Sequence, residues 1–188
     1  MEGQQMTSFK RINGLHHYAY RCRNAEETRS FYEDLLQLPL AHVIQANEVP
    51  STGASDPYVH LFFEFDDGSY IAFFDLGDET ACVPDPETPS WVNHFAMQVA
   101  TVDEVKKWKE LLEGAGVEVV GVTDHGFVKS IYFFDPNGIR LEITSEVIDE
   151  NERQTHRDEA RAALKAWTDT RPPPPSDFYL YKNERMDA

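Results

Sequence analysis

The sequence predicts an α+β fold that contains the same βαβββ unit twice, followed by a different C-terminal region. Two stretches, residues 12–77 and 90–145, each show a strand pattern, then a helical pattern, then two or three further strand patterns. A proline-rich joint at residues 78–89 separates them. Residues 146–188 follow the second unit and do not share its pattern. We therefore expect four segments: two modules, a linker, and a C-terminal helix with a tail.

Composition limits the classes of partner. The chain has 188 residues, 41% of them hydrophobic, which is enough for a real core in one domain or two small ones. Its formal net charge of -16 argues against nucleic acid and against anionic membranes, because both attract basic surfaces. No signal segment and no run of 18 apolar residues is visible, so we expect a cytoplasmic protein. Cys22 and Cys82 are too few to indicate a disulfide framework or a zinc ribbon.

The first unit opens with an aromatic, alternating strand pattern at residues 14–20. Asn24, with Glu27 three residues later, predicts the start of a helix, because both side chains can cap free backbone N–H groups there. Residues 43–57 are polar and contain two prolines and a glycine, so we expect a loop.

The second unit repeats this order. Residues 91–99 predict a strand with His94 near its centre. Thr101 and Glu104 form a capping box that predicts the start of a helix, which two glycines end. Residues 117–122 predict another strand.

Each unit ends in a predicted β-hairpin. In the first, the strand patterns 58–65 and 69–76 are joined by Asp-Asp-Gly, a strong hairpin signal. In the second, the patterns 130–134 and 138–144 flank Asp-Pro-Asn-Gly. The two hairpins align at their glycines, Gly68 and Gly138.

The C-terminal region predicts a charged helix up to about residue 170, with an apolar stripe of Ala160, Ala163, Leu164 and Trp167. Four prolines and an aromatic tail follow. One interpretation, which we favour, is a helix that covers an exposed face of the domain, with the tail packed on the same chain. The other is a tail that reaches a second subunit.

Glu142 stands out because it places a carboxylate in a strand that otherwise appears buried. Such a carboxylate is costly unless a proton, a partner or a metal meets it. The aligned units place His17 and His94 at matching positions, and Glu142 matches the apolar Ala72. Two imidazoles and one carboxylate form a facial triad that suits Fe(II), while Mn(II), Zn(II), Co(II) or Ni(II) could also bind. The alternative is that these histidines are hydrogen-bonded core residues.

The segments "HHYAY", "NHFAMQV" and "SIYFFDPNGIRLEIT" resemble the vicinal oxygen chelate superfamily over residues 12–145. That superfamily includes glyoxalase I, fosfomycin resistance proteins, methylmalonyl-CoA epimerase and type I extradiol ring-cleaving dioxygenases. The resemblance implies that the paired modules form a curved, barrel-like mixed sheet around a metal cavity. It also implies that His17, His94 and Glu142 are the metal ligands. Members often form homodimers and bind small-molecule substrates.

The resemblance also separates the possible chemistries. Glyoxalase I and the epimerase generally use a fourth ligand or base at the position where this chain has Ala72. Extradiol dioxygenases use two histidines and one glutamate, with a tyrosine ten residues before the glutamate, and Tyr132 matches that tyrosine. We therefore expect an Fe(II) extradiol dioxygenase that acts on a catechol-like aromatic, with Tyr132 hydrogen-bonded to the substrate.

Several further residues are candidates for the same pocket. His60 and His125 are the two candidates for a proton relay. Phe62, the symmetry partner of Tyr132, and Phe74 would form an aromatic wall for the substrate. Two rival functions stay open: a lyase, isomerase or epimerase that uses another divalent metal with His60 or Glu64 as base, and a non-catalytic binding protein of the drug-sequestering kind.

Overall fold

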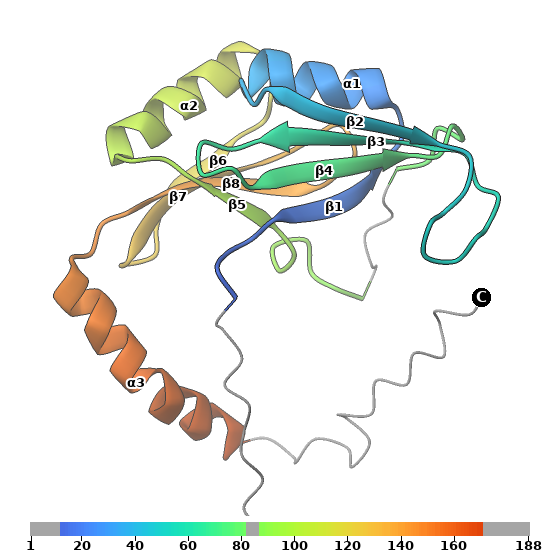
Figure 1. Cartoon of the computed structure of the whole chain (residues 1–188). Coiled ribbons are helices and arrows are strands. Elements are labelled where there is room, and N and C mark those ends of the chain that lie inside the picture. The colour runs from blue at the N-terminus through green and yellow to red at the C-terminus, as the bar shows by residue number, and fades with distance from the viewer. Residues whose placement is uncertain (1–11, 82–86, 171–188) are drawn as a thin grey trace, which may run out of the picture. The chain divides into compact units, whose positions relative to one another are not determined.

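The computed structural model describes residues 12–81 and 87–170 (Figure 1). The predicted proline-rich and aromatic tail and Cys82 lie outside these residues. The described chain divides into two compact units. The first contains the residues up to 81 together with residues 135–138, and the second contains the rest.

The first unit holds a four-stranded sheet in the order β1-β4-β3-β2. β1 runs parallel to β4, whereas β3 is antiparallel to both β4 and β2. The loop predicted at residues 43–57 starts later than expected, because residues 43–46 belong to the edge strand β2. Most side chains of this edge strand are exposed, so the sequence there lacks the alternation of a half-buried strand. The strands are β1 (His17–Cys22), β2 (Leu40–Ala46), β3 (Tyr58–Glu64) and β4 (Tyr70–Asp75).

The predicted helix start at Asn24 is confirmed. Its side-chain oxygen accepts a hydrogen bond from the backbone N–H of Glu27 at 2.9 Å. This residue caps α1 (Ala25–Arg29), which continues directly into a π-helical segment, η1 (Ser30–Leu35). The wider turn of η1 still buries Tyr32 fully in the unit's core.

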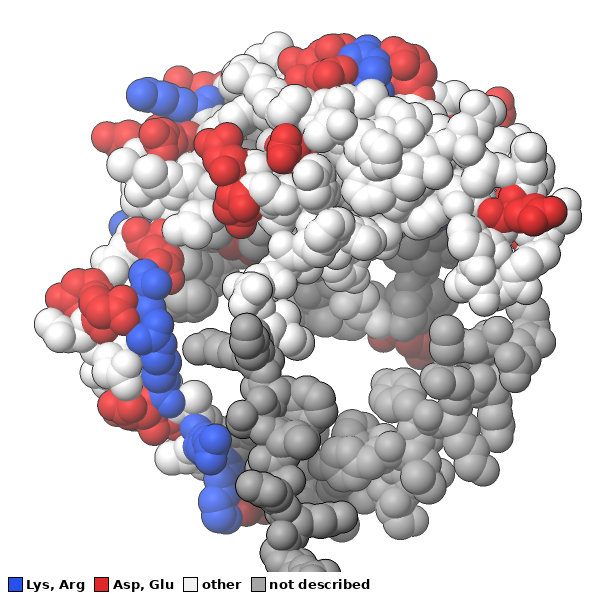
Figure 2. Space-filling model, viewed as in Figure 1, with Lys and Arg blue, Asp and Glu red and all other residues white. Residues whose placement is uncertain are grey.

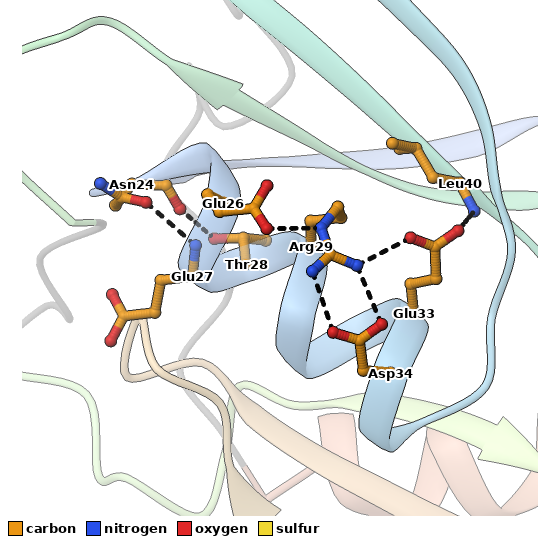
Figure 3. Close-up of polar contacts among 8 residues, drawn as sticks. All are labelled: Asn24, Glu26, Glu27, Thr28, Arg29, Glu33, Asp34 and Leu40. Atoms are coloured by element: carbon orange, nitrogen blue, oxygen red, sulfur yellow. Dashed lines mark hydrogen bonds and ion pairs between the residues drawn. The ribbon is translucent and has the colours of Figure 1, made fainter.

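Arg29 stabilises the junction of α1 and η1 with three carboxylates (Figure 3). Its guanidinium group donates to Glu26 at 2.8 Å and to Glu33 and Asp34 at 2.9 Å. Glu33 in turn accepts the backbone N–H of Leu40 at 3.2 Å, at the start of β2. The cluster therefore connects the helical segment to the edge strand that follows it.

The core of the first unit is aromatic. Tyr32 stacks against Phe63, with ring centres 5.3 Å apart, and lies 4.7 Å from the ring of Phe73. These three side chains and Ile71 are fully buried. Phe63 on β3 and Ile71 and Phe73 on β4 alternate with residues that point to the other face of the sheet. The face that packs against the helical segment therefore forms the core, and the opposite face is left for a site.

Cys22 ends β1 inside this core and is only 1% exposed. Burial, with smaller contributions from the carboxylates of Asp75 and Asp135, raises the pKa of its thiol from 9.0 to about 11. A thiol with a higher pKa in the folded chain than in the unfolded chain adds stability below pH 9. That contribution is lost as the pH rises through about 11.

We therefore expect the Cys22 thiol to be protected from alkylation in the folded protein. In a Cys82→Ser background at pH 8, iodoacetamide should modify Cys22 at least about a hundredfold more slowly in buffer than in denaturant, because thiolate is the reactive form. Mass spectrometry of timed samples measures both rates. Equal rates would show that Cys22 is not part of a closed core.

The second unit repeats the architecture, with sheet order β5-β8-β7-β6. Thr101 and Glu104 form the predicted capping box at the start of its helix. That helix packs on β7 and β8, and Val105 and Leu112 are its fully buried residues. The elements are β5 (Phe95–Gln98), α2 (Val102–Gly114), β6 (Val120–Asp124), β7 (Val128–Phe134) and β8 (Arg140–Glu146).

Two boundaries in this unit differ from the prediction. β5 begins at Phe95, so His94 precedes the strand and is not near its centre. β6 begins at Val120, three residues later than expected. In both cases the apolar residues before the strand lie in turns or irregular segments. Their sequence alternates as in a strand, but their backbone does not pair with a neighbouring strand.

Strand register shows that the two units are equivalent residue by residue. Tyr18 lies opposite Ile71 in the first sheet, and Phe95 lies opposite Leu141 in the second. His17 and His94, each one position earlier, are therefore equivalent. In the same way Phe62 faces Ala72, and Tyr132 faces Glu142. The predicted fold class, an α+β fold of paired βαβββ modules with a C-terminal helix, is confirmed; each module has its own curved, open sheet.

The C-terminal helix, α3 (Glu150–Thr168), starts at a capping box of Asp149 and Glu152. None of its residues is buried, so the interpretation that this helix covers a face of the domain is wrong for the described residues. Most of its side chains are charged or polar, which allows the helix to be exposed to water. Within the described part of the chain, no helix combines the length and apolar character needed to span a bilayer.

Candidate metal centre

The second unit brings two of the three predicted ligands into contact. Nε2 of His94 lies 3.0 Å from Oε2 of Glu142. Glu142 projects from β8 and is only 5% exposed, and His94 immediately precedes β5, the parallel neighbour of β8. The buried carboxylate that the sequence singled out is therefore met by an imidazole.

A backbone carbonyl determines which nitrogen of His94 carries a proton. Nδ1 of His94 lies 3.0 Å from the carbonyl oxygen of Val92. A carbonyl can only accept, so Nδ1 must donate, and in a neutral imidazole the lone pair is then on Nε2. That lone pair points at a carboxylate oxygen 3.0 Å away, and two acceptors at this distance need a cation between them. The cation is either a proton shared by the pair or a metal ion.

The geometry fits a divalent metal. Neighbouring ligand atoms about 2.1 Å from an octahedral ion are about 3.0 Å apart, which is the separation of these two atoms. The hydrogen bond from Nδ1 to Val92 is also the usual outer contact of a metal-binding histidine, because it fixes the ring and directs Nε2 to the ion. A simple histidine–carboxylate ion pair would show the same distance, and metal analysis separates the two.

Tyr132 lies beside this pair. Its hydroxyl group is 2.8 Å from Nε2 of His125, and its residue faces Glu142 across β7 and β8. Burial and the neighbouring Glu142 carboxylate raise the pKa of the Tyr132 phenol, so it remains protonated at neutral pH. The guanidinium carbon of Arg140 lies 4.4 Å from the centre of the Tyr132 ring. The second unit alone therefore combines His94, Glu142, Tyr132 and His125.

The first unit contributes His17 at the start of β1. Its Nδ1 lies 2.7 Å from Nδ1 of His16, so one of the two nitrogens donates and the other accepts. This contact leaves Nε2 of His17 for another ligand. The ring of His17 also lies 5.6 Å from Phe62 and 6.3 Å from His60.

His60 lies in an aromatic surface on the same side of the first sheet. Its ring stacks on Phe74 at 3.6 Å and meets Phe62 edge-on at 4.1 Å. It is 5% exposed, and its Nδ1 is buried without a hydrogen-bond partner among the described residues. Desolvation, together with His17, lowers the pKa of His60 to about 4, so the imidazole is neutral at pH 7.

The three predicted ligands belong to different units. His17 is in the first unit, whereas His94 and Glu142 are in the second. In the described part of either unit, no three His, Cys, Asp or Glu side chains lie close enough to hold a metal. The three-ligand centre therefore stays a prediction, and the His94–Glu142 contact is the part that one unit contains.

Three contacts of the site were not predicted. His16 contacts His17, the Val92 carbonyl orients His94, and Arg140 covers the Tyr132 ring. Arg140 and Glu142 are two residues apart on β8, so strand alternation places both side chains on one face. The other two contacts come from residues just before a strand, where alternation gives no direction.

Comparison with known families identifies the scaffold. A model of the Glyoxalase/Bleomycin resistance protein/Dioxygenase superfamily matches residues 14–143. The chain belongs to this superfamily. The match spans both modules, including the His94–Glu142 contact, and ends before α3.

One curated protein is similar to part of this chain. The Bacillus subtilis (strain 168) protein named "Putative ring-cleaving dioxygenase MhqA" is 30% identical over 64 residues, which are 32% of this chain. The aligned part spans only 20% of that relative's own length. Its activity therefore enters below as a proposal.

Solved structures share the superfamily's fold with this chain. The fosfomycin resistance protein FosX from Listeria monocytogenes, complexed with Mn(II) and sulfate, is 20% identical, with a TM-score of 0.54 over 75% of this chain and 98% of FosX. Glyoxalase I from Leishmania major is 18% identical, with a TM-score of 0.54 over 84% and 99% of the two chains. At these identities the likeness shows the fold alone.

Proposed function

We propose that this superfamily member is an Fe(II)-dependent extradiol dioxygenase that cleaves a catechol-like aromatic, with His17, His94 and Glu142 as its metal ligands. The observation that carries the proposal is the contact of His94 with the buried Glu142, whose facing atoms, Nε2 and Oε2, lie 3.0 Å apart, as neighbouring ligand atoms of one metal ion would. Mn(II), Zn(II), Co(II) and Ni(II) remain the other candidates for the ion. The resemblance to a ring-cleaving dioxygenase over 64 residues supports this class of reaction.

The position equivalent to Glu142 in the first unit favours the dioxygenase over a glyoxalase-type enzyme. That position is Ala72, which faces Phe62 as Glu142 faces Tyr132. Ala72 is fully buried and supplies neither a ligand nor a base. The protein would therefore offer the metal three ligands and leave positions free for two substrate oxygens and dioxygen.

The chain's own residues would hold the substrate and move protons. The bound metal would supply the redox chemistry of ring opening. Tyr132, protonated and 2.8 Å from His125, would donate a hydrogen bond to a substrate oxygen. His125 is exposed, so it could take up a proton released on binding and pass it to solvent.

The aromatic surface of the first unit would contact the substrate ring. Phe62 and Phe74 provide its apolar walls, and His60 stacks on Phe74 and meets Phe62 edge-on. Because His60 is neutral and buried, its free Nδ1 would serve as a hydrogen-bonding atom and not as a charge. This surface favours a planar, uncharged ring.

Anaerobic reconstitution with Fe(II), followed by a panel of catechols, tests the proposed reaction. We expect oxygen uptake and a yellow ring-cleavage product with at least one catechol. No oxygen uptake with any catechol would remove the dioxygenase function. Turnover under nitrogen with Zn(II), Ni(II) or Mn(II) would instead support a lyase, isomerase or epimerase, and stoichiometric ligand binding without turnover would support a binding protein.

Replacement of Tyr132 by phenylalanine should separate catalysis from metal binding. We expect kcat to fall about a hundredfold, the usual contribution of a positioned acid or hydrogen-bond donor. Metal content should stay at the wild-type value, because Tyr132 is not a ligand. Tyr18→Phe, on the opposite face of β1 from His17, is the matched control and should keep wild-type kcat. Unchanged kcat in Tyr132→Phe would contradict the assigned role.

A further inference from the structure

Arg140 places a positive charge on the face of the second sheet that carries the His94–Glu142 contact. It lies two residues before Glu142 on β8, and its side chain shares that face. Its guanidinium carbon lies 4.4 Å from the centre of the Tyr132 ring, and the centre of that ring lies 5.9 Å from the centre of the His94 ring. A single aromatic ring therefore contacts both Arg140 and the imidazole of the candidate metal centre.

Among the described residues, Arg140 has no carboxylate partner, which distinguishes it from most other basic side chains. Within residues 12–81 and 87–170, every lysine and arginine forms an ion pair with an aspartate or glutamate except Lys107, Arg140 and Arg161. Figure 2 shows such pairs as blue atoms that lie against red ones, over α1 and along α3. Lys107 and Arg161 are exposed on helices, where water solvates their charge, whereas Arg140 is half-buried on a sheet.

The contacts of Arg140 leave most of its hydrogen-bond donors available. The guanidinium group lies over the Tyr132 ring, and Nη1 donates a long hydrogen bond, 3.4 Å, to the carbonyl oxygen of Ser90. A guanidinium group has several N–H donors in one plane, so most of them have no acceptor among the described residues. This planar fork matches the two oxygens of a carboxylate.

We propose that Arg140 binds a carboxylate substituent on the aromatic ring of the substrate. The inference rests on the proposed function, because it requires the two ring oxygens to meet the metal centre of His94 and Glu142. Two residues along a strand are about 7 Å apart, close to the span from a catechol oxygen across the ring to a carboxylate on its far side. The charge lies on the substituent, so the ring itself stays uncharged.

The other side of Glu142 gives the bound substrate a direction. Ser130 and Thr144 lie there, each two residues from Tyr132 or Glu142 on the same face, and their hydroxyl groups bond each other at 2.8 Å. These side chains are neutral and satisfy each other. The charged end of the substrate would therefore lie toward Arg140.

Titration calorimetry under nitrogen tests the inference without turnover. The ligands are a catechol that carries a carboxylate para to one hydroxyl group and the methyl ester of the same compound, each added to the full chain reconstituted with Fe(II). We expect the ratio of the two Kd values to favour the carboxylate at least about tenfold more in the wild type than in Arg140→Gln, the usual contribution of a charged hydrogen bond. Arg140→Lys keeps the charge but not the fork, so its ratio should fall between the two.

Arg161→Gln is the matched control, because it removes an exposed arginine that also has no carboxylate partner among the described residues. It should keep the wild-type ratio, and thermal melting checks that all variants stay folded. An unchanged ratio in Arg140→Gln would overturn the inference; if both affinities fell together, Arg140 would only hold the Tyr132 ring. A wild type that binds neither ligand would overturn it as well. Failure of the proposed function gives a different result, in which the carboxylate is preferred but no oxygen is consumed when air is admitted.

Discussion

Replacing Glu142 by alanine should remove metal binding and activity together. Glu142 is the buried carboxylate of the site, and its oxygen lies 3.0 Å from Nε2 of His94. Without it, the imidazole lone pair keeps its orientation from Val92 but loses the second ligand beside it. We expect metal affinity to fall by at least about a hundredfold and kcat/KM to fall by a similar or larger factor.

A matched control lies on the same strand. Glu146, four residues later and on the same face of β8, forms an ion pair with Arg153 at the start of α3. Glu146→Ala should keep wild-type metal content and activity, which excludes a general effect of losing a carboxylate from β8. Metal content is measured after dialysis against metal-free buffer. A Glu142→Ala protein that retains stoichiometric metal would show that His94 and Glu142 form only an ion pair.

Asp135→Ala should strongly reduce the free energy of unfolding. Asp135 accepts hydrogen bonds from the hydroxyl of Tyr32 at 3.1 Å and from the backbone N–H and side-chain amide of Asn137 at 2.9 and 3.1 Å. The amide of Asn137 also donates to Thr28 at 3.2 Å, and all four residues are buried. Loss of the carboxylate leaves the Tyr32 hydroxyl without this acceptor inside the core, which costs about 3 kcal/mol.

Asp67 supplies the control for this prediction. It makes the same kind of turn contact in the other hairpin, accepting the backbone N–H of Ser69 at 2.9 Å, but at the exposed end of that hairpin. Asp67→Ala should therefore reduce the free energy of unfolding by less than about 1 kcal/mol. Urea unfolding followed by circular dichroism measures both. Equal losses of unfolding free energy in the two variants would show that the buried hydrogen bonds of Asp135 stabilise the fold no more than an exposed turn contact does.

Local chemistry made much of the fold predictable. The caps at Asn24 and Thr101 and the two hairpin turns depend on residues close in sequence, so their side chains determine the structure directly. β2 was missed because an edge strand with exposed side chains does not alternate. The exposure of α3 was missed because an apolar stripe predicts burial without saying which chain buries it.

The candidate site was predictable for a different reason. The duplication assigns the same register position to His17 and His94, and it contrasts Glu142 with Ala72. What the sequence could not supply was the set of outer contacts. The carbonyl of Val92 has no sequence signal, because any residue could provide it. The contact of the Arg140 guanidinium group with the Tyr132 ring depends on the conformations of two side chains on neighbouring strands.

The most direct test of the central claim is the iron content of the full chain after anaerobic reconstitution with Fe(II) and removal of unbound metal. We predict one ion per chain in the wild type, and loss of that ion in each of His17→Ala, His94→Ala and Glu142→Ala. A wild-type chain that retains no ion after reconstitution, or a His17→Ala chain that retains its ion fully, would contradict a metal centre with these three ligands.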